Sequence, residues 1–155
     1  MRAICVDTGF LIGLYDRTDE FHDIASRYFV EFFDTGSNHL LIPWPILYEA
    51  ISTRMVKNKE GLARLEKDWK RLAVQRRLDI LSDEPFRDTV INECFDELGK
   101  PLPQYRKLSA VDRVVRRMLS DTHLRIHAFV TFNPGDFVDV CAKHRRDVFT
   151  HQARG

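Results

Sequence analysis

Short apolar runs alternate with longer stretches of helical periodicity along this chain of 155 residues. The apolar runs predict strands at 2–7, 39–42, 78–81, 126–131 and, as a short edge strand, 147–150. Strands that alternate with helices are typical of parallel sheets, because each crossover between parallel strands needs room for a helix. The pattern therefore predicts an α/β fold built on a central parallel sheet.

Helical spacing predicts helices at 8–15, from about 20 to a stop at 36–38, and at 46–57, 59–75, 83–99 and 109–121. Pro45 suits the first turn of the third helix, where its missing N–H costs nothing, and this puts Glu49 in the first turn as well. Ser109 is a suitable N-cap for the last helix. Segments 101–103 and 133–136 read as a loop and a turn. One stripe of the second helix is predicted to be core: Ile24, Ala25, Tyr28, Phe29, Phe32 and Phe33.

The composition, 44% hydrophobic and 30% charged, is that of a globular protein, and we expect one domain over residues 1–155. No apolar stretch approaches the roughly 20 residues that span a bilayer, and no signal peptide is recognisable, so we expect a cytoplasmic protein without a membrane partner. Cys5, Cys94 and Cys141 are widely spaced and form no C-x-x-C pair. They are interpreted as small buried residues rather than as disulfide or zinc ligands.

The net charge is only +1, but it is unevenly distributed. Residues 1–100 carry 14 basic and 18 acidic side chains, whereas residues 101–155 carry 10 basic and 5 acidic ones. The basic excess in the last third is typical either of a phosphate-binding rim or of a solvated helix face, and the sequence leaves both open. Much of it comes from Arg113, Arg116, Arg117, Arg125, Lys143, Arg145 and Arg146.

Four acidic residues lie where a parallel sheet would build a site. Asp7 ends the first strand, Glu49 follows the second, Asp112 opens the last helix and Asp136 follows the fourth strand. Ligands of open parallel sheets bind beyond the carboxyl ends of the strands. Each acid also has a structural interpretation: Asp7 as a helix cap, Glu49 as a first-turn acid, Asp112 as a partner of Arg116, and Asp136 as a turn residue.

Clustered carboxylates repel one another until a proton or a cation relieves the repulsion, and an all-oxygen set favours Mg²⁺ or Mn²⁺ over zinc. Such ions suit chemistry on phosphodiesters. The chain lacks the G-x-x-x-x-G-K-[ST], G-x-G-x-x-G, G-x-S-x-G and H-E-x-x-H patterns, which weakens the corresponding nucleotide-binding, hydrolase and zinc-protease interpretations.

At four segments the chain resembles the PIN-domain nucleases, especially the VapC-type toxins of toxin–antitoxin pairs. The segments are 6–11 (VDTGFL), 47–50 (LYEA), 109–112 (SAVD) and 131–137 (TFNPGDF), in that order. The resemblance implies a three-layer α/β/α sandwich with a central parallel sheet. It also implies an endoribonuclease that depends on Mg²⁺ or Mn²⁺.

The resemblance carries over to individual residues. Asp7, Glu49 and Asp112 match the three acidic metal ligands, and Asp136 is favoured as the fourth, with Asn133 as an auxiliary contact. These four acids are the predicted catalytic residues.

Four further residues have predicted supporting roles, and partners are expected as well. Thr8 and Thr131 would orient the carboxylates, and Arg113 or Arg116 would hold an adjacent phosphate of the RNA substrate. The candidate protein partners are a small antitoxin and, in a homodimer, a second copy of the chain. The alternatives are a catalytically silent or RNA-processing PIN-like module that binds RNA or protein, and a different magnesium-dependent phosphoryl-transfer enzyme, such as a small phosphatase.

Overall fold

The computed structural model describes residues 1–100 and 107–151. Its strands are β1 (Ala3–Val6), β2 (His39–Pro43), β3 (Leu78–Leu81), β4 (Ala128–Val130) and β5 (Asp147–Phe149). All five pair in parallel, in the spatial order β3-β2-β1-β4-β5. The predicted α/β fold with a central parallel sheet is confirmed, including the edge strand at 147–150.

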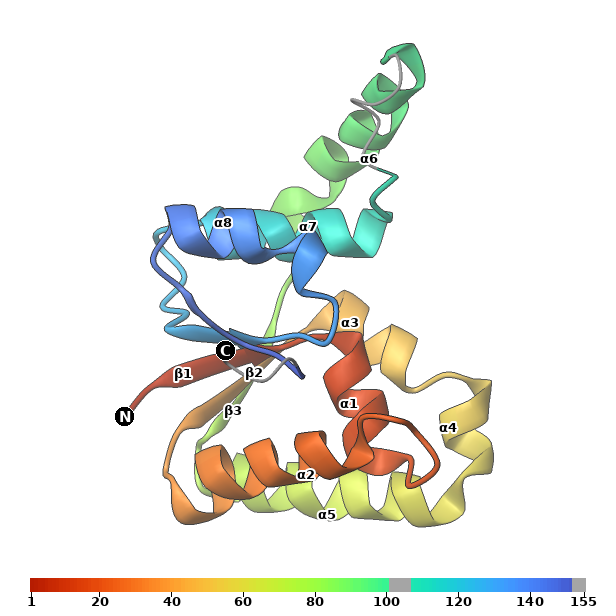
Figure 1. Cartoon of the computed structure of the whole chain (residues 1–155), viewed down its shortest axis with the longest axis vertical. Coiled ribbons are helices and arrows are strands. Elements are labelled where there is room, and N and C mark those ends of the chain that lie inside the picture. The colour runs from red at the N-terminus through yellow and green to blue at the C-terminus, as the bar shows by residue number, and fades with distance from the viewer. Residues whose placement is uncertain (101–106, 152–155) are drawn as a thin grey trace.

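Helices flank this sheet on both faces (Figure 1). On one side lie α1 (Thr8–Tyr15), α2 (His22–Phe29) with its π-helical extension η1 (Val30–Thr35), and α5 (Lys59–Val74). On the other lie α7 (Ala110–Ser120) and α8 (Val138–Lys143). The structure also contains α3 (Trp44–Ala50), α4 (Thr53–Lys57), α6 (Arg87–Asp96) and the short 3₁₀ turns η2 (Glu84–Phe86), η3 (Glu97–Gly99) and η4 (Pro134–Asp136).

The core is one cluster in which the sheet contacts both helical layers. Its largest fully buried side chains include Phe10, Phe33, Phe129 and Phe137. The predicted aromatic stripe of α2 and η1 belongs to this core, because Ala25, Phe29, Phe32 and Phe33 are buried and Ile24 and Tyr28 pack against them. The cysteines are free, and Cys5 and Cys141 are buried as predicted, whereas Cys94 is only half-buried.

One predicted helix is wrong. The segment 46–57 forms two helices, α3 and α4, because the backbone of Ser52 is extended, with ψ of 178°, and starts a new helix. Ile51, Ser52 and Thr53 are poor helix formers, and Ser is favoured where a helix begins. The consequence is that Glu49 lies in the last turn of α3 and not in its first turn.

Four other features lie in the second half of the chain. The helix α8 was not predicted, whereas Ser109 caps α7 as expected. The predicted loop at 101–103 lies outside the described residues. The arm formed by α6 and η3 projects from the body beside α7 (Figure 1).

No helix within residues 1–100 or 107–151 has the length and apolar character needed to cross a membrane.

The contact of α5 with the end of α1 gives a test of the packing. A Cβ atom added to the buried Gly61 would lie 2.2 Å from the backbone oxygen of Tyr15. Alanine is ordinarily favoured over glycine in a helix by about 1 kcal/mol. Because a backbone atom must move here, we expect Gly61→Ala to lower the free energy of unfolding by roughly 2 kcal/mol in urea titrations.

Gly99→Ala is the matched control, since a Cβ there meets nothing within 4 Å. Its effect should stay within about 0.5 kcal/mol. An increase in stability on Gly61→Ala would contradict the close packing of α1 and α5.

Candidate active site at the carboxyl edge of the sheet

Asp7 lies at the point where the strand order reverses, between β1 and β4. Its backbone N–H donates to the Val130 carbonyl at 3.0 Å, so the ladder extends to the acid itself. Its side chain, in a residue only 8% exposed, accepts from the Thr8 N–H at 2.8 Å and from the Thr131 hydroxyl at 2.9 Å. Asp7 is therefore the cap of α1 and also a carboxylate fixed in the crevice where parallel sheets bind ligands.

Thr131 connects this acid to the loop after β4. Its buried hydroxyl donates to Asp7 and accepts from the Asn133 N–H at 3.0 Å. Asn133 in turn donates from its side-chain amide to Asp136 Oδ2 at 2.6 Å. The hydroxyl therefore fixes both the first carboxylate and the loop that carries the fourth.

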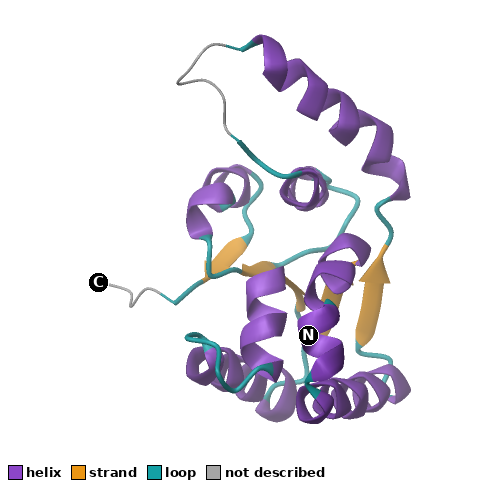
Figure 2. Cartoon of the chain, turned by 90° about the vertical axis from the view of Figure 1, so that its right-hand side faces the viewer, coloured by secondary structure: helices purple, strands orange, loops and turns teal. Residues whose placement is uncertain are grey.

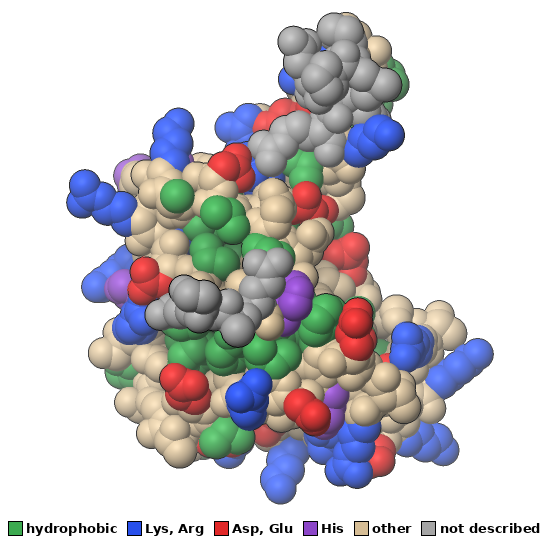
Figure 3. Space-filling model, viewed as in Figure 1, with side chains coloured by type: hydrophobic (Ala, Val, Ile, Leu, Met, Phe, Trp, Pro, Cys, Tyr) green, Lys and Arg blue, Asp and Glu red, His purple; other side chains and the backbone are tan. Residues whose placement is uncertain are grey.

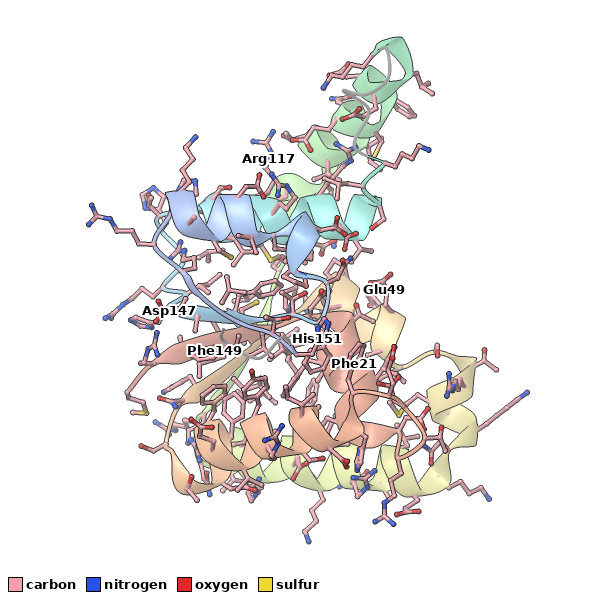
Figure 4. All side chains as sticks on the ribbon, viewed as in Figure 1. Phe21, Glu49, Arg117, Asp147, Phe149 and His151 are labelled. Atoms are coloured by element: carbon pink, nitrogen blue, oxygen red, sulfur yellow. The ribbon has the colours of Figure 1, made fainter. Side chains whose placement is uncertain are left out.

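Glu49 lies on α3, the helix that follows β2. Its exposed carboxylate accepts from the Thr8 hydroxyl at 2.8 Å, so Thr8 contacts two acids, one through its backbone and one through its side chain. Figure 4 shows Glu49 on the outer side of α3, at the end of the molecule where β1 leads into α1. The same edge faces the viewer in Figure 2.

Asp112 lies in the first turn of α7 and is half-buried. Its backbone N–H donates to the Ser109 hydroxyl at 3.1 Å, and an interaction of its carboxylate with the Ser109 side chain lowers its pKa against the effect of burial. The predicted alternative, an ion pair with Arg116, is not formed. Arg116 instead donates to both carboxylate oxygens of Asp139, at 2.7 and 2.9 Å, and to the Asp136 carbonyl at 2.7 Å.

Charge effects on the pKa values link the four acids. Burial, together with the charges of Asp112 and Glu49, raises the pKa of Asp7 to about 6, against the lowering effect of its hydrogen bonds to Thr8 and Thr131. Burial also raises the pKa of Asp112, with contributions from Asp136 and Glu49. The charges of Asp112 and Glu49 therefore reach Asp7, and those of Asp136 and Glu49 reach Asp112, beyond the ends of β1, β2 and β4.

The side chains do not close around a common point in their present conformations. Within the part of the chain that the structure describes, no group of three or more His, Cys, Asp or Glu side chains is arranged to hold a metal ion. Glu49 and Asp136 are turned to the hydrogen bonds that they accept from Thr8 and Asn133.

The contacts of Arg113 are with residues other than the four candidate acids. It is only 7% exposed, donates to the Leu108 carbonyl at 3.1 Å and forms ion pairs with Glu97 at 3.3 Å and Glu93 at 3.8 Å. The residue therefore attaches the α6 arm to α7. Its contacts do not support the predicted role as a phosphate ligand, and those of Arg116 support instead a role in holding the loop of Asp136.

Part of the basic excess of the last third of the chain is structural. Arg146 donates to the carbonyls of Leu119, Ile126 and Asp121, and Arg117 pairs with Glu93. In Figure 3 acidic side chains stand on the flank between the α6 arm and α3, whereas many Lys and Arg side chains project from other margins of the molecule. On the face that Figure 3 shows, the described Lys and Arg side chains therefore do not gather around the acidic flank.

No protein-family model matches this chain, and no curated protein matches it.

The raised pKa of Asp7 makes folding stability depend on pH. The carboxyl has an ordinary pKa of 3.8 in the unfolded chain and about 6 in the fold, so the folded state holds the extra proton between these values. Protonation stabilises the fold, and this contribution is lost as the pH rises through 6. Asp7→Asn keeps an oxygen for the Thr8 N–H and removes the buried charge.

At about pH 7.5 we therefore expect the variant to be more stable than wild type, on the order of 2 kcal/mol, with the difference shrinking towards pH 4. Urea titrations across this range measure it. Asp23→Asn, an exposed change of the same chemistry on α2, should show no such trend. A destabilised Asp7→Asn at neutral pH would refute the buried charge.

The ion pairs of Arg113 give a second test. Removing one partner of a buried pair leaves the other uncompensated, so Arg113→Ala should lower the free energy of unfolding by roughly 3 kcal/mol. Arg117→Ala, which removes a guanidinium from a half-exposed pair with Glu93, should cost under about 1 kcal/mol. Unchanged stability with weakened RNA binding would instead restore the phosphate role of Arg113.

Proposed function

We propose that this chain is an endoribonuclease that depends on Mg²⁺ or Mn²⁺ and hydrolyses RNA phosphodiester bonds, on a three-layer α/β/α fold of the PIN type. The observation that supports the proposal is that Asp7 and Asp112 each lie within electrostatic reach of two other acids of the set, beyond the carboxyl ends of the strands. These acids come from four separate segments, and two of them have a raised pKa because they are buried near the others.

The donor set fits the proposed ion in its chemistry. All of its side-chain donors are oxygens, which hard divalent cations prefer, and the set carries an excess of negative charge that a cation would neutralise. Asp7, Glu49, Asp112 and Asp136 would hold the ion, with Asn133 as an auxiliary oxygen donor. When bound, the ion supplies positive charge to the scissile phosphate and favours deprotonation of the attacking water.

Hydrogen bonds within the chain hold the candidate ligands in position. The Thr8 N–H and the Thr131 hydroxyl hold the Asp7 carboxylate in one orientation, and Ser109 satisfies the first turn of α7, which keeps Asp112 at the site. Such hydrogen-bonded supports reduce the reorganisation that binding requires.

The finer assignment rests on the resemblance of the four sequence segments. On that basis we propose a toxin of a toxin–antitoxin pair, with an antitoxin and a second copy of the chain as candidate partners. The alternative is a PIN-like module that binds RNA or protein without turnover, and the experiment below separates it from the nuclease.

We expect the purified protein to cleave single-stranded RNA with Mg²⁺ or Mn²⁺ and to lose this activity with a chelator. Asp7→Asn and Asp112→Asn should each lower the cleavage rate at least about 100-fold, because both remove a charge that holds the ion. Asp23→Asn is the matched control and should cleave like wild type. Gel assays with end-labelled RNA measure the rates.

A readout independent of activity accompanies the assay. Mg²⁺ should raise the melting temperature of wild type and of Asp23→Asn but not of Asp7→Asn, because ligands that bind only the folded state stabilise it. Metal-dependent cleavage by both site variants at the wild-type rate would exclude the proposed roles. RNA binding that weakens steeply with salt, without cleavage in any divalent ion, would identify the binding module.

A further inference from the structure

Two aromatic side chains are exposed beside the acidic site. Trp44 and Tyr48 are one helical turn apart on α3, and their rings stack with centroids 5.7 Å apart and planes inclined by 29°. Trp44 is 38% exposed and Tyr48 is 74% exposed. Tyr48 directly precedes Glu49, so the stacked pair adjoins one of the candidate ligands.

The fold does not account for this pair. The buried face of α3 is formed by Ile46, Leu47 and Ala50, which belong to the core. Tyr48 lies on the opposite, solvated side, where a large aromatic ring gains little from packing. An exposed ring held flat by a second ring is a surface suited to stacking another planar group.

A cation lies on the next element along the same edge. Arg87, the first residue of α6, is positioned by two hydrogen bonds to Asp83, at 3.0 and 3.2 Å, and its side chain remains 61% exposed. Arg87 follows β3, the strand that pairs with β2, and β2 leads into the helix that carries Tyr48. Aromatic rings interleaved with arginine are the usual features of surfaces that bind single-stranded nucleic acids.

The topology aligns these groups with the acids. Arg87 follows β3, the pair on α3 follows β2, and Asp7 follows β1, and these three strands are neighbours in the order β3-β2-β1. The carboxyl ends of adjacent parallel strands share one edge of the sheet. A strand of RNA that runs along this edge meets the cation, the aromatic pair and the acidic site in turn.

We propose that Trp44 and Tyr48 form a stacking platform for an unpaired base of single-stranded RNA, and that Arg87 contacts a phosphate next to that base. The inference rests on the proposed function and names the residues that would hold its single-stranded substrate. The bases of a duplex are already stacked on one another and could not occupy the platform. The position of the ring pair on the same edge as the proposed nuclease site favours a base of RNA over a protein partner as the occupant.

The test measures binding with a chelator present, so that RNA is not consumed. Probes are fluorescein-labelled oligo(A), oligo(U) and their duplex, each about 12 nucleotides long. We expect Tyr48→Ala to weaken single-strand binding about tenfold and Tyr48→Phe, which keeps the ring, to leave it within about twofold. Ile91→Ala, an exposed apolar truncation on α6, is the matched control and should bind like wild type.

A spectroscopic readout isolates the platform. The chain has two tryptophans, so Trp69→Phe leaves Trp44 as the only indole. Oligo(A) should quench its fluorescence in this background, and Tyr48→Ala should reduce the quenching. A platform that merely supports the fold would not respond to RNA in this way.

The outcomes separate this inference from the proposed function. Metal-dependent cleavage by wild type, together with unchanged affinity and quenching in Tyr48→Ala, overturns the platform and leaves the nuclease. Absence of both RNA binding and cleavage in wild type overturns the two together. A change of oligomeric state in Tyr48→Ala, seen by sedimentation without a change in RNA affinity, would assign the surface to a second copy of the chain and overturn the platform.

Discussion

The arrangement of the candidate site depends on one buried carboxylate. Asp7 ends the central strand, and its two oxygens accept from the Thr8 N–H and the Thr131 hydroxyl. The first bond starts α1, and the second joins the end of β1 to the loop after β4. Because that loop carries Asp136, and because the Thr8 hydroxyl reaches Glu49, the orientation of a single side chain is coupled to the positions of two others. A site of this kind needs no dedicated domain, since it arises where the ends of parallel strands already meet.

The same carboxylate has a cost in stability. A buried acid whose pKa is raised to about 6 is held charged at neutral pH against the preference of its surroundings, and the nearby acids add to that strain. Packing elsewhere offsets the cost: the sheet is buried between two helical layers, and the acid itself occupies a position where a polar group can still be capped. A protein selected for stability alone would place an amide or a hydroxyl there. The retained charge is therefore an argument that the site has a chemical role.

The sequence was most informative about residues that directly follow a strand, because the direction of parallel strands decides at which edge of the sheet such residues lie. Asp7 and Asp136 follow strands, and any parallel sheet that contains those strands carries both acids to one edge. Glu49 was correctly assigned to a helix after the second strand. It was predicted in the first turn of that helix and lies in the last, because the break at Ser52 depends on a backbone conformation that periodicity does not encode. The partners of Arg113 and Arg116 could not be predicted, because charge patterns do not say which acids of other elements lie opposite. The platform of Trp44 and Tyr48 was missed for a related reason: aromatic residues one turn apart usually indicate a buried face, and only burial separates the two cases.

The order of strands also distributes chemistry along the carboxyl edge. The candidate acids are concentrated around β1, where Asp7 is buried. Towards β3 follow the exposed aromatic pair and then Arg87, which is exposed and paired with Asp83. A polyanion would be repelled by the first set and attracted by the last, so its affinity has to come from the outer end of the edge, and its phosphate enters the acidic end only if a cation is bound there. If the proposed function holds, binding and reaction would be separable properties of one edge, because stacking and the arginine would act without a metal whereas the acids would contribute only with one.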